Sequence, residues 1–358
     1  MTEILNLTRG NPDPAAFPIE DLIRCSEENM KRDGKIVLQY GHAPGYAPLR
    51  EWFAQHYSVK PNNVFMGNSS LEIFNFLTQT ELKPGVRAFT ESPSYDRANT
   101  LLRRSGAEVV GIPMEPDGMD LGVFEKEIKK GTPALVYIIA DFQNPMGTTT
   151  SEAKRRQIAA WAQQYGFWIV EDAPYRSLRY RGSDVPTLYS MASDRVLHMS
   201  SVSKILAPGL RLGYLIGSEA IVTRLVKFAV DTYIGPVLTS QGMVYEYFRQ
   251  GLLEPNIEKL KKIYGPRQVG AVASLDKHIP GTIIARPEGG YFVSINLPKG
   301  NTMDKLLARA DSVGLKLTDG RGFYLNPEDG DRFLRIPFCQ IAPDVMEEAI
   351  RRVASILD

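Results

Sequence analysis

The middle of the chain alternates short, nearly continuous apolar runs with longer segments of helical periodicity. Each apolar run has the length of one buried strand, and the runs fall at 86–90, 108–112, 134–140, 167–170, 196–199 and 212–216. Helices are predicted over 96–105 and over 151–165, the second with Ser151 as its N-cap. Strands that are covered on both faces lack polar alternation, and strand–helix–strand repeats place neighbouring strands parallel. The pattern therefore predicts an α/β domain with a mainly parallel sheet.

After about residue 240 the pattern changes. A long charged helix over 257–275, interrupted by Gly265 and Pro266, is followed by shorter segments at 290–296 and 304–312, a short strand near 333–336 and a final helix over 343–357. This order predicts a smaller α+β domain. We expect the chain to divide into an N-terminal arm (1–13), a small domain (14–40 with 266–358) and a large ligand-binding domain (41–265).

Composition narrows the class of protein. The 358 residues carry 42 Lys and Arg against 41 Asp and Glu, a net charge of +1 that favours neither nucleic acid nor an anionic membrane as partner. No apolar run approaches the roughly 20 residues that span a bilayer, and the first residues lack the apolar stretch of a signal peptide. Cys25 and Cys339 are too far apart for a disulfide framework and fit no zinc spacing, so no metal site is predicted. We expect a cytoplasmic protein.

Polar clusters follow three of the predicted strands, at 141–145, 171–175 and 200–204. Each cluster taken alone is equally well explained as an ordinary loop. Because the carboxyl ends of parallel strands meet at one edge of a sheet, the three clusters are expected to lie together, where α/β sheets bind ligands.

The residue types in these clusters match the needs of pyridoxal phosphate (PLP). Its aldehyde needs a lysine amine, its ring nitrogen a carboxylate, its ring oxygen hydrogen-bond donors, and its phosphate hydroxyls and an arginine. The chain offers Lys204 to hold the aldehyde as a Schiff base, Asp172 for the nitrogen, Asn144 and Tyr175 for the ring oxygen, and Ser201, Ser203 and Arg211 for the phosphate. A lysine after serines is often a surface residue, but the segment 205–210 that follows Lys204 is too apolar for a solvated loop.

Two further positions suggest contacts with the same cofactor. Asn68 and Ser69 precede an apolar helix over 71–78, so they offer N–H groups and side chains to a phosphate, although a plain N-cap explains them too. Tyr95 follows the strand 86–90 and is placed to stack on the cofactor ring; a core aromatic is the alternative.

The chain resembles the class I/II aminotransferases of PLP fold type I, and within them the 2-aminoadipate and kynurenine aminotransferase group. The similar segments run in order from about residue 7 to the C-terminus, and the clearest are 38–41, 45–51, 141–147, 170–175, 201–213, 286–292 and 334–336. The resemblance implies a large domain with a mostly parallel seven-stranded sheet and a smaller α+β domain. One departure is Asn68-Ser69-Ser70, where relatives usually have Ser-Gln-Gln.

The resemblance also implies roles for individual residues. Tyr40 is expected to cross a homodimer interface to the partner's cofactor phosphate, and Arg335 to hold the substrate α-carboxylate with Asn144 beside it. Gly10 lies in the loop expected to cover the substrate. Lys204, Asp172 and Tyr175 are the expected catalytic residues.

These roles predict transfer of an amino group from an amino acid to a 2-oxo acid, with 2-oxoglutarate as the expected acceptor, by a ping-pong mechanism in which Lys204 moves the proton. Other reactions of the same cofactor (β-lyase, decarboxylase, racemase or oxidase) remain open, as does a non-catalytic sensor, which the absence of a basic DNA-binding segment disfavours. The substrate is not determined. Arg9, Arg24 and Arg321 are either surface charges, which we favour, or anchors for a second substrate carboxylate.

Overall fold

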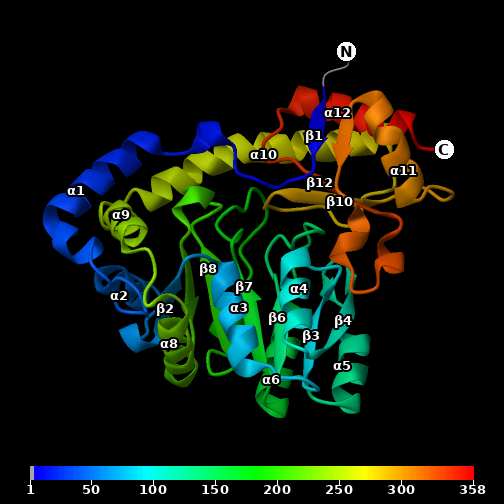
Figure 1. Ribbon diagram of the computed structural model, residues 1–358. Coiled ribbons are helices and arrows are strands. Elements are labelled where there is room, and N and C mark those ends of the chain that lie inside the picture. Colours follow the sequence, from blue (N-terminus) through cyan, green and yellow to red (C-terminus); the bar gives the residue numbers. More distant parts are fainter. Residues whose placement is uncertain (1–3) are drawn as a thin grey trace.

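The computed structural model describes residues 4–358, so the first three residues of the predicted arm lie outside the described part (Figure 1). Its main feature is one large sheet, whose strands in spatial order are β2 (Val64–Gly67), β9 (Gly213–Ile216), β8 (Val196–Ser201), β7 (Trp168–Asp172), β6 (Leu135–Ile138), β3 (Arg87–Ser92), β4 (Glu108–Glu115) and β5 (Gly118–Met119). The run from β8 to β4 is parallel, whereas β9 and β5 are antiparallel to their neighbours. Seven strands were expected; the two-residue strand β5 is the eighth.

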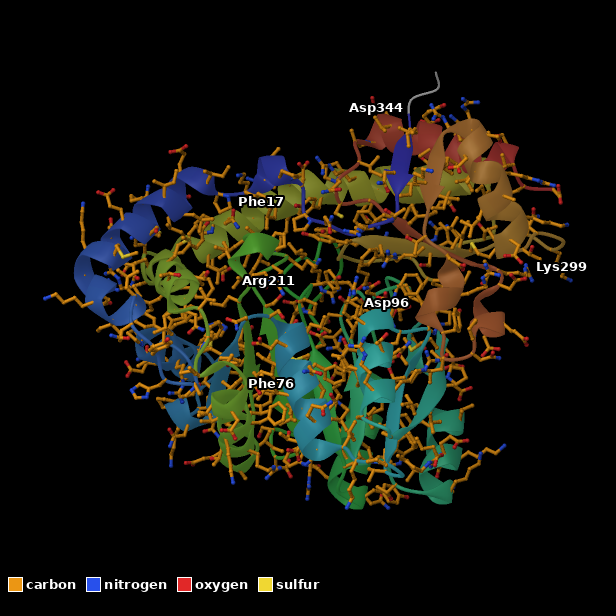
Figure 2. The ribbon with its side chains drawn as sticks, in the orientation of Figure 1. Phe17, Phe76, Asp96, Arg211, Lys299 and Asp344 are labelled. Atoms are coloured by element: carbon orange, nitrogen blue, oxygen red, sulfur yellow. The ribbon has the colours of Figure 1, made fainter. Side chains whose placement is uncertain are left out.

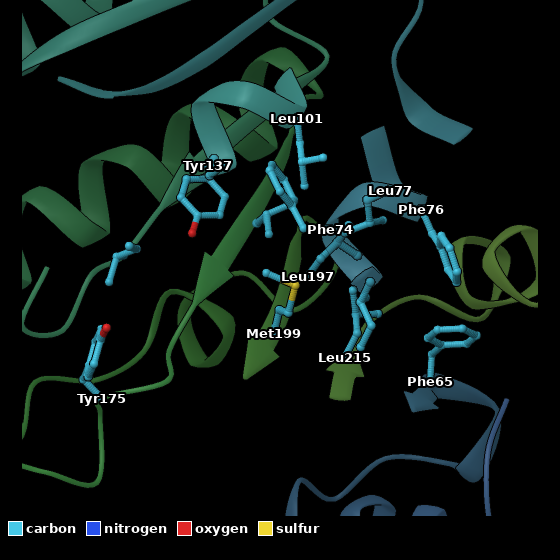
Figure 3. Close-up of a cluster of buried hydrophobic side chains, with 14 of the residues drawn as sticks. Phe65, Phe74, Phe76, Leu77, Leu101, Tyr137, Tyr175, Leu197, Met199 and Leu215 are labelled. Atoms are coloured by element: carbon cyan, nitrogen blue, oxygen red, sulfur yellow. The ribbon is translucent and has the colours of Figure 1, made fainter. Parts of the chain in front are cut away.

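Both faces of this sheet are buried, which explains the continuous apolar runs. Along β6, Leu135 and Tyr137 enter one core, and Val136 and Ile138 enter the core on the opposite face. The first core contains residues from α3 (Ser70–Glu81), α4 (Asp96–Arg104) and α8 (Glu219–Tyr233); the second contains residues from α5 (Leu121–Lys130), α6 (Glu152–Tyr165) and α7 (Leu188–Met191). Figure 3 shows part of the first core, where Phe74 of α3 lies near Tyr137, Leu197 and Met199 of the strands.

A second body is formed by the C-terminal part of the chain. Its elements are the antiparallel pair β10 (Phe292–Asn296) and β12 (Phe333–Pro337), the parallel pair β1 (Leu5–Leu7) and β11 (Leu315–Leu317), and the helices α11 (Met303–Ala310) and α12 (Pro343–Ser355). These elements share one apolar core. Residues 5–7 of the predicted arm thus form a strand that belongs to this second body.

Helix α10 (Leu253–His278) connects the two bodies without a break (Figure 1). The sequence predicted an interruption at Gly265 and Pro266, and this prediction is wrong. A proline inside a helix costs about 3 kcal/mol, but α10 is packed on both sides of it: Leu260 and Tyr264 enter the core of the large sheet, and Ala271 and Leu275 that of the C-terminal body. The predicted domain boundary between residues 265 and 266 falls in this shared helix.

Helix α1 (Ile19–Val37), in the predicted range 14–40, packs against α9 (Leu238–Arg249). Its buried Cys25 and Val37 share a core with α2 (Ala47–His56) and α9, beside the large sheet. Ile19, Ile23 and Met30 point outward from α1 and are exposed. None of the helices among residues 4–358 is both long and apolar enough to cross a membrane.

Candidate active site

A cavity of about 480 Å³ lies at the carboxyl ends of the central strands, bounded by residues of the large sheet, the C-terminal body and the N-terminal arm. Figure 2 shows Arg211 and Asp96 on the side of the sheet that faces the C-terminal body. The cavity brings together residues that the sequence predicted for the site: Gly10, Ser69, Tyr95, Asn144, Asp172, Tyr175, Ser201, Ser203, Lys204, Arg211 and Arg335. Of the predicted site residues, Asn68 and Tyr40 do not line it.

Lys204 is held three residues beyond the end of β8. Its backbone carbonyl accepts a hydrogen bond from the Tyr291 hydroxyl (2.9 Å), and its Nζ donates to the Gly10 carbonyl (3.1 Å). The residue is partly exposed, but protein surrounds its amine, and this loss of solvation lowers the pKa of the amine below its usual value, with nearby Arg335 acting in the same direction. A lysine held this way is more readily neutral and hence nucleophilic.

Asp172 is the last residue of β7 and is buried. Burial raises the pKa of its carboxyl to about 6, although the hydrogen bond from Tyr137 (2.6 Å to Oδ2) opposes that change. The other oxygen, Oδ1, is buried and has no hydrogen-bond partner among the described residues. A buried carboxylate oxygen without a partner is costly, so the cavity holds an acceptor ready for a cationic N–H group.

Arg335 of β12 crosses the cavity to Asn144. Its Nη1 donates to Asn144 Oδ1 (3.0 Å), and its Nη2 donates to the Thr8 carbonyl (2.8 Å). The guanidinium carbon lies 4.6 Å from the ring centroids of both Phe292 and Phe323, which fixes the orientation of its plane. Its Nε is buried and has no hydrogen-bond partner among the described residues. That free donor is available to an anion, because guanidinium binds a carboxylate through two parallel N–H groups.

The loop that carries Asn144 is anchored by a buried ion pair that the sequence did not reveal. Arg155 of α6 is fully buried; its Nη2 donates to Asp141 Oδ1 (2.7 Å) and to the Ala140 carbonyl (2.9 Å). Arg176 donates to the other oxygen of Asp141 (2.9 Å), and these arginines lower the pKa of that carboxyl against the effect of burial. In the sequence Arg155 is simply one charge of an amphipathic helix.

Serine hydroxyl groups line the cavity at and near the N-terminus of α3. Ser69 caps this helix by accepting from the Glu72 N–H (3.1 Å), and Ser69, Ser70, Ser201 and Ser203 all line the cavity. A Cβ at Gly213 of β9 would lie 2.2 Å from the Ser70 nitrogen, so only glycine lets the strand approach the helix end this closely. The helix terminus provides N–H groups and a positive dipole end to an anion.

Arg211, Tyr95 and Tyr175 also line the cavity. Arg211 adopts a left-handed backbone (φ 48°), which is unusual for a residue with a side chain and typical of functional loops. Tyr95 borders the cavity at the start of α4, and burial raises the pKa of its hydroxyl to about 12. Burial likewise raises the pKa of Tyr175, so both hydroxyls are donors at neutral pH.

Asn68 departs from its expected place. Its Oδ1 accepts from the Val237 N–H (2.9 Å) and its Nδ2 donates to Glu72 (3.2 Å), so its side chain serves the loop instead of the cavity. Ser70, which the sequence did not single out, lines the cavity there. Tyr40 is 81% exposed and has no place in this chain's own cavity.

The N-terminal arm covers one side of the cavity. Thr8, Arg9, Gly10 and Asn11 line it, and a Cβ at Gly10 would lie 2.3 Å from the Phe292 ring, so the arm lies flat on that ring. Sequence reasoning missed Thr8, Thr318, Phe292 and Phe323. These are common residue types, and they lie in the arm and in the second body. Arg24 and Arg321 lie outside the cavity lining; Arg24 pairs with Asp21 (2.8 Å), and Arg321 pairs with Asp304 and Asp319 (2.8 Å each).

The residues fit the cofactor that the sequence suggested. PLP presents a protonated ring nitrogen, an aldehyde and a phosphate dianion, and the cavity contains an unpartnered buried carboxylate oxygen, a lysine amine of lowered pKa and a helix N-terminus lined with serines.

Comparison with known proteins agrees with this chemistry. The family model "Aminotransferase class I and II" matches residues 2–353. The chain is 28% identical to 2-aminoadipate transaminase of Thermus thermophilus (99% of this chain, 90% of that protein) and 30% identical to aromatic-amino-acid aminotransferase 1 of Thermococcus litoralis (99% and 88%). The crystal structure of Pyrococcus horikoshii kynurenine aminotransferase in complex with PMP matches with a TM-score of 0.94 at 29% identity, covering 99% of this chain and 91% of that one.

Proposed function

Because the chain belongs to the class I and II aminotransferases, PLP-dependent enzymes of fold type I that move an amino group from an amino acid to a 2-oxo acid, we propose that Lys204 is the residue that binds the cofactor and transfers the proton. One observation carries this proposal: the lysine amine of lowered pKa shares a cavity with the unpartnered Oδ1 of Asp172. When bound, PLP withdraws electrons from the carbon that bears the amino group and so weakens its C–H bond.

Asp172 would hold the cofactor's ring nitrogen. Its free Oδ1 accepts the N–H, and its negative charge keeps that nitrogen protonated. Tyr137 holds the other oxygen and so fixes the direction of the carboxylate. Tyr175 and the amide nitrogen of Asn144 are the donors for the ring oxygen, since Asn144 Oδ1 is already used by Arg335. Tyr95 lines the same space and would stack on the ring.

The phosphate would lie at the N-terminus of α3. Ser69, Ser201, Ser203 and Arg211 were predicted to bind it, and the position of Ser70 adds a fifth group. We assign Asn68 the role of bracing this loop through Glu72 and the Val237 N–H.

Arg335 would bind the α-carboxylate of the substrate. Asn144, Thr8 and two aromatic rings fix its guanidinium, and its buried Nε has no hydrogen-bond partner among residues 4–358. Gly10 keeps the arm close enough to cover this position. With the carboxylate held there, the amine of Lys204 can remove a proton from the substrate carbon that bears the amino group and later deliver that proton to a different atom. The lowered pKa of this lysine favours the neutral amine, which is the form that acts as a base.

We further propose a homodimer in which Tyr40 reaches the partner's phosphate site. Tyr40 is 81% exposed although it is a large aromatic residue. It lies near other exposed apolar side chains in sequence, and the outer face of α1 borders an apolar groove lined by Ile19, Leu22, Ile23, Met30, Leu210 and Met243. Exposed apolar surface of this kind is typical of an interface between subunits.

The acceptor and the compartment are the remaining parts of the proposal. We propose 2-oxoglutarate as the acceptor, which carries the α-carboxylate that Arg335 would bind. A cytoplasmic location accords with two buried cysteines that remain unpaired.

The decisive experiment replaces Lys204 by alanine. The purified wild-type enzyme, loaded with PLP, should show the visible absorbance of lysine-bound cofactor and convert 2-oxoglutarate to glutamate with at least one donor from a pool of amino acids, followed by mass spectrometry. Lys204→Ala should lose both, whereas Lys129→Ala, a substitution of an exposed lysine on α5, should keep both. Normal turnover by Lys204→Ala would remove Lys204 from the mechanism.

A further inference from the structure

Two arginines line the cavity and have no partner there. Arg9 belongs to the arm and Arg97 to the first turn of α4; both are exposed, and neither side chain forms a hydrogen bond or an ion pair with any described residue. The other cationic groups of the cavity are engaged: Arg335 with Asn144 and Thr8, Lys204 with Gly10, and Arg211 with the Pro208 carbonyl. Arg9 and Arg97 are therefore the cations of the described lining whose side chains have no hydrogen bond within the protein.

Their place relative to the proposed substrate is defined by their neighbours. Arg9 stands between Thr8, whose carbonyl is bound by Arg335, and Gly10, whose carbonyl is bound by Lys204. The backbone of Arg9 is thus held beside the space between the anchor for the α-carboxylate and the catalytic amine. Arg97 borders the same cavity from α4, two residues after Tyr95.

Two cations of the cavity lining remain unassigned after the cofactor and an α-carboxylate are placed. Its lining has the cations Arg9, Arg97, Lys204, Arg211 and Arg335 and the carboxylates Asp96 and Asp172. The cofactor accounts for Lys204, Arg211 and Asp172, and the α-carboxylate accounts for Arg335. Arg9 and Arg97 are left with Asp96 as the one unassigned carboxylate of the lining, in a cleft where a positive side chain attracts anions more strongly than it does in open water.

We propose that the enzyme prefers amino acids whose side chain ends in a carboxylate, and that Arg9 and Arg97 bind this second carboxylate. This inference rests on the proposed function, because it takes Arg335 as the anchor of the α-carboxylate. Arginine is suited to the task, since its planar fork offers two parallel N–H groups to a carboxylate and keeps its charge at any physiological pH. Asp96 would limit the site to one net charge.

The test compares each acid with its own amide, which has nearly the same shape and no charge. The second-order rate constant of the first half-reaction, which needs no acceptor, is measured by the loss of the lysine-bound cofactor absorbance for glutamate and glutamine, and for aspartate and asparagine. The enzymes compared are the PLP-loaded wild type, Arg9→Gln, Arg97→Gln and the double variant. We expect the wild type to favour at least one acid over its amide by about tenfold or more, as a hydrogen-bonded ion pair provides. Each single variant should lower that ratio, and the double variant should bring it near one.

Arg104→Gln is the matched control. It removes the same charge from the same helix, and Arg104 does not line the cavity, so the acid-to-amide ratio should stay at the wild-type value. A loss of preference in this variant as large as in Arg97→Gln would mean that only the general charge of α4 matters, and would overturn the assignment of Arg97.

Other results overturn the inference while leaving the proposed function intact. If the wild type converts amides as well as acids, or if the Arg9 and Arg97 variants slow both substrates by the same factor, the second-carboxylate site does not exist. If Arg97→Gln instead loses its cofactor on dialysis, Arg97 binds the phosphate. Failure of the proposed function is distinguishable from all of these, because then no amino donor is converted and Lys204→Ala keeps the wild-type absorbance.

Discussion

At the scale of single residues, the site depends on a carboxyl group that is buried before any ligand arrives. Asp172 has one oxygen bound by Tyr137 and the other free, and burial raises its pKa to about 6. A protonated ring nitrogen at Oδ1 would supply the countercharge that the protein itself lacks, and would favour the ionised carboxylate.

Replacing Asp172 by asparagine should therefore separate charge from shape. The amide keeps the volume but cannot hold the ring nitrogen in its protonated form, so we expect kcat/KM to fall by about a hundredfold or more. Tyr137→Phe is the comparison: it removes the hydrogen bond and leaves the charge, and should cost about tenfold. Steady-state kinetics at saturating PLP measure both. If Asp172→Asn retained more activity than Tyr137→Phe, the proposed role of the charge would be wrong.

Glu91 is a second buried carboxyl at the same sheet edge, and sequence reasoning did not identify it. Its Oε2 accepts from Gln143 Nε2 (3.0 Å) and from the Ile139 N–H (3.2 Å), so it holds the loop that leads to Asn144. Burial raises the pKa of Glu91 to about 8. The folded protein thus binds this proton more tightly than the unfolded chain does.

The sign of the resulting pH dependence follows directly. The stabilisation that comes from binding this proton is fully present below pH 4.5, the pKa of the Glu91 carboxyl in the unfolded chain. It is lost as pH rises through about 8, the pKa of the same carboxyl in the folded protein. Between about pH 6.5 and 8, above the pKa of Asp172, the unfolding free energy of the cofactor-free protein should fall by up to about 1.4 kcal/mol per pH unit.

Glu91→Gln, which stays neutral, should flatten this fall, and Glu125→Gln on the surface should not. Urea unfolding at several pH values measures the slopes. Equal slopes for Glu91→Gln and the wild type would show that Glu91 is not the titrating group.

At the scale of elements, the site depends on how closely a strand approaches a helix end. Gly213 of β9 lies against the backbone of Ser69 and Ser70, at the N-terminus of α3 where the phosphate is proposed to bind. The position tolerates no side chain, because an added Cβ would meet backbone atoms, which cannot rotate away.

Gly213→Ala should push the end of α3 away from the sheet and weaken PLP binding by about tenfold or more, the effect of losing one hydrogen bond to a charged group. Gly209→Ala, in the 3-10 turn just before β9, is the matched control, since an added Cβ there meets nothing within 4 Å. Titration of the apoenzyme with PLP, followed by fluorescence, gives both dissociation constants. Equal constants for the two variants would argue against the helix end as the phosphate site.

Packing also explains the errors at this scale. Local propensity ends a helix at Pro266, but two cores hold α10 on either side of it, and only the three-dimensional arrangement reveals the second core. Helix α1 lies in the range 14–40, which we expected to belong to the small domain. In the structure it packs against α9 and shares a core with it beside the large sheet. We retain the division into an arm and two domains as a proposal, with α10 as the shared element.

At the scale of the whole molecule, the proposed homodimer makes each site depend on both chains. If Tyr40 serves the partner's phosphate, then Lys204→Ala and Tyr40→Phe damage the same site of a mixed dimer and leave the other site intact. The site that keeps Lys204 in the Tyr40→Phe chain receives the intact Tyr40 of the other chain.

Mixing equal amounts of the two variants after subunit exchange should therefore restore activity. Half of the dimers are mixed and each has one intact site, so about a quarter of all sites regain wild-type properties. The assay uses a PLP concentration at which Tyr40→Phe alone is largely inactive. Activity equal to the average of the separate variants, or a monomer in analytical ultracentrifugation, would contradict the exchange of Tyr40.

Much of the fold and the gathering of the site follow from local patterns. The strand pattern predicted the parallel sheet, and the positions of Asn144, Asp172 and Lys204 after successive strands predicted that they would meet, as they do in one cavity. Residues contributed by other elements were harder to find: Thr8, Ser70, Arg97, Phe292 and Phe323 have no local signal, and Asn68 has the right residue type but its side chain is bound elsewhere.

The sequence by itself determined the class of fold, the family and the set of groups at the strand ends, because hydrophobic periodicity and short motifs are properties of neighbouring residues. Only the tertiary structure decided which oxygen of Asp172 is left without a partner, which arginines are already bound and which remain available, and how closely Gly213 approaches α3. These properties depend on burial and on contacts between segments up to 327 residues apart, such as Thr8 and Arg335. No local pattern contains that information, since solvation and contact geometry exist only once the chain has folded.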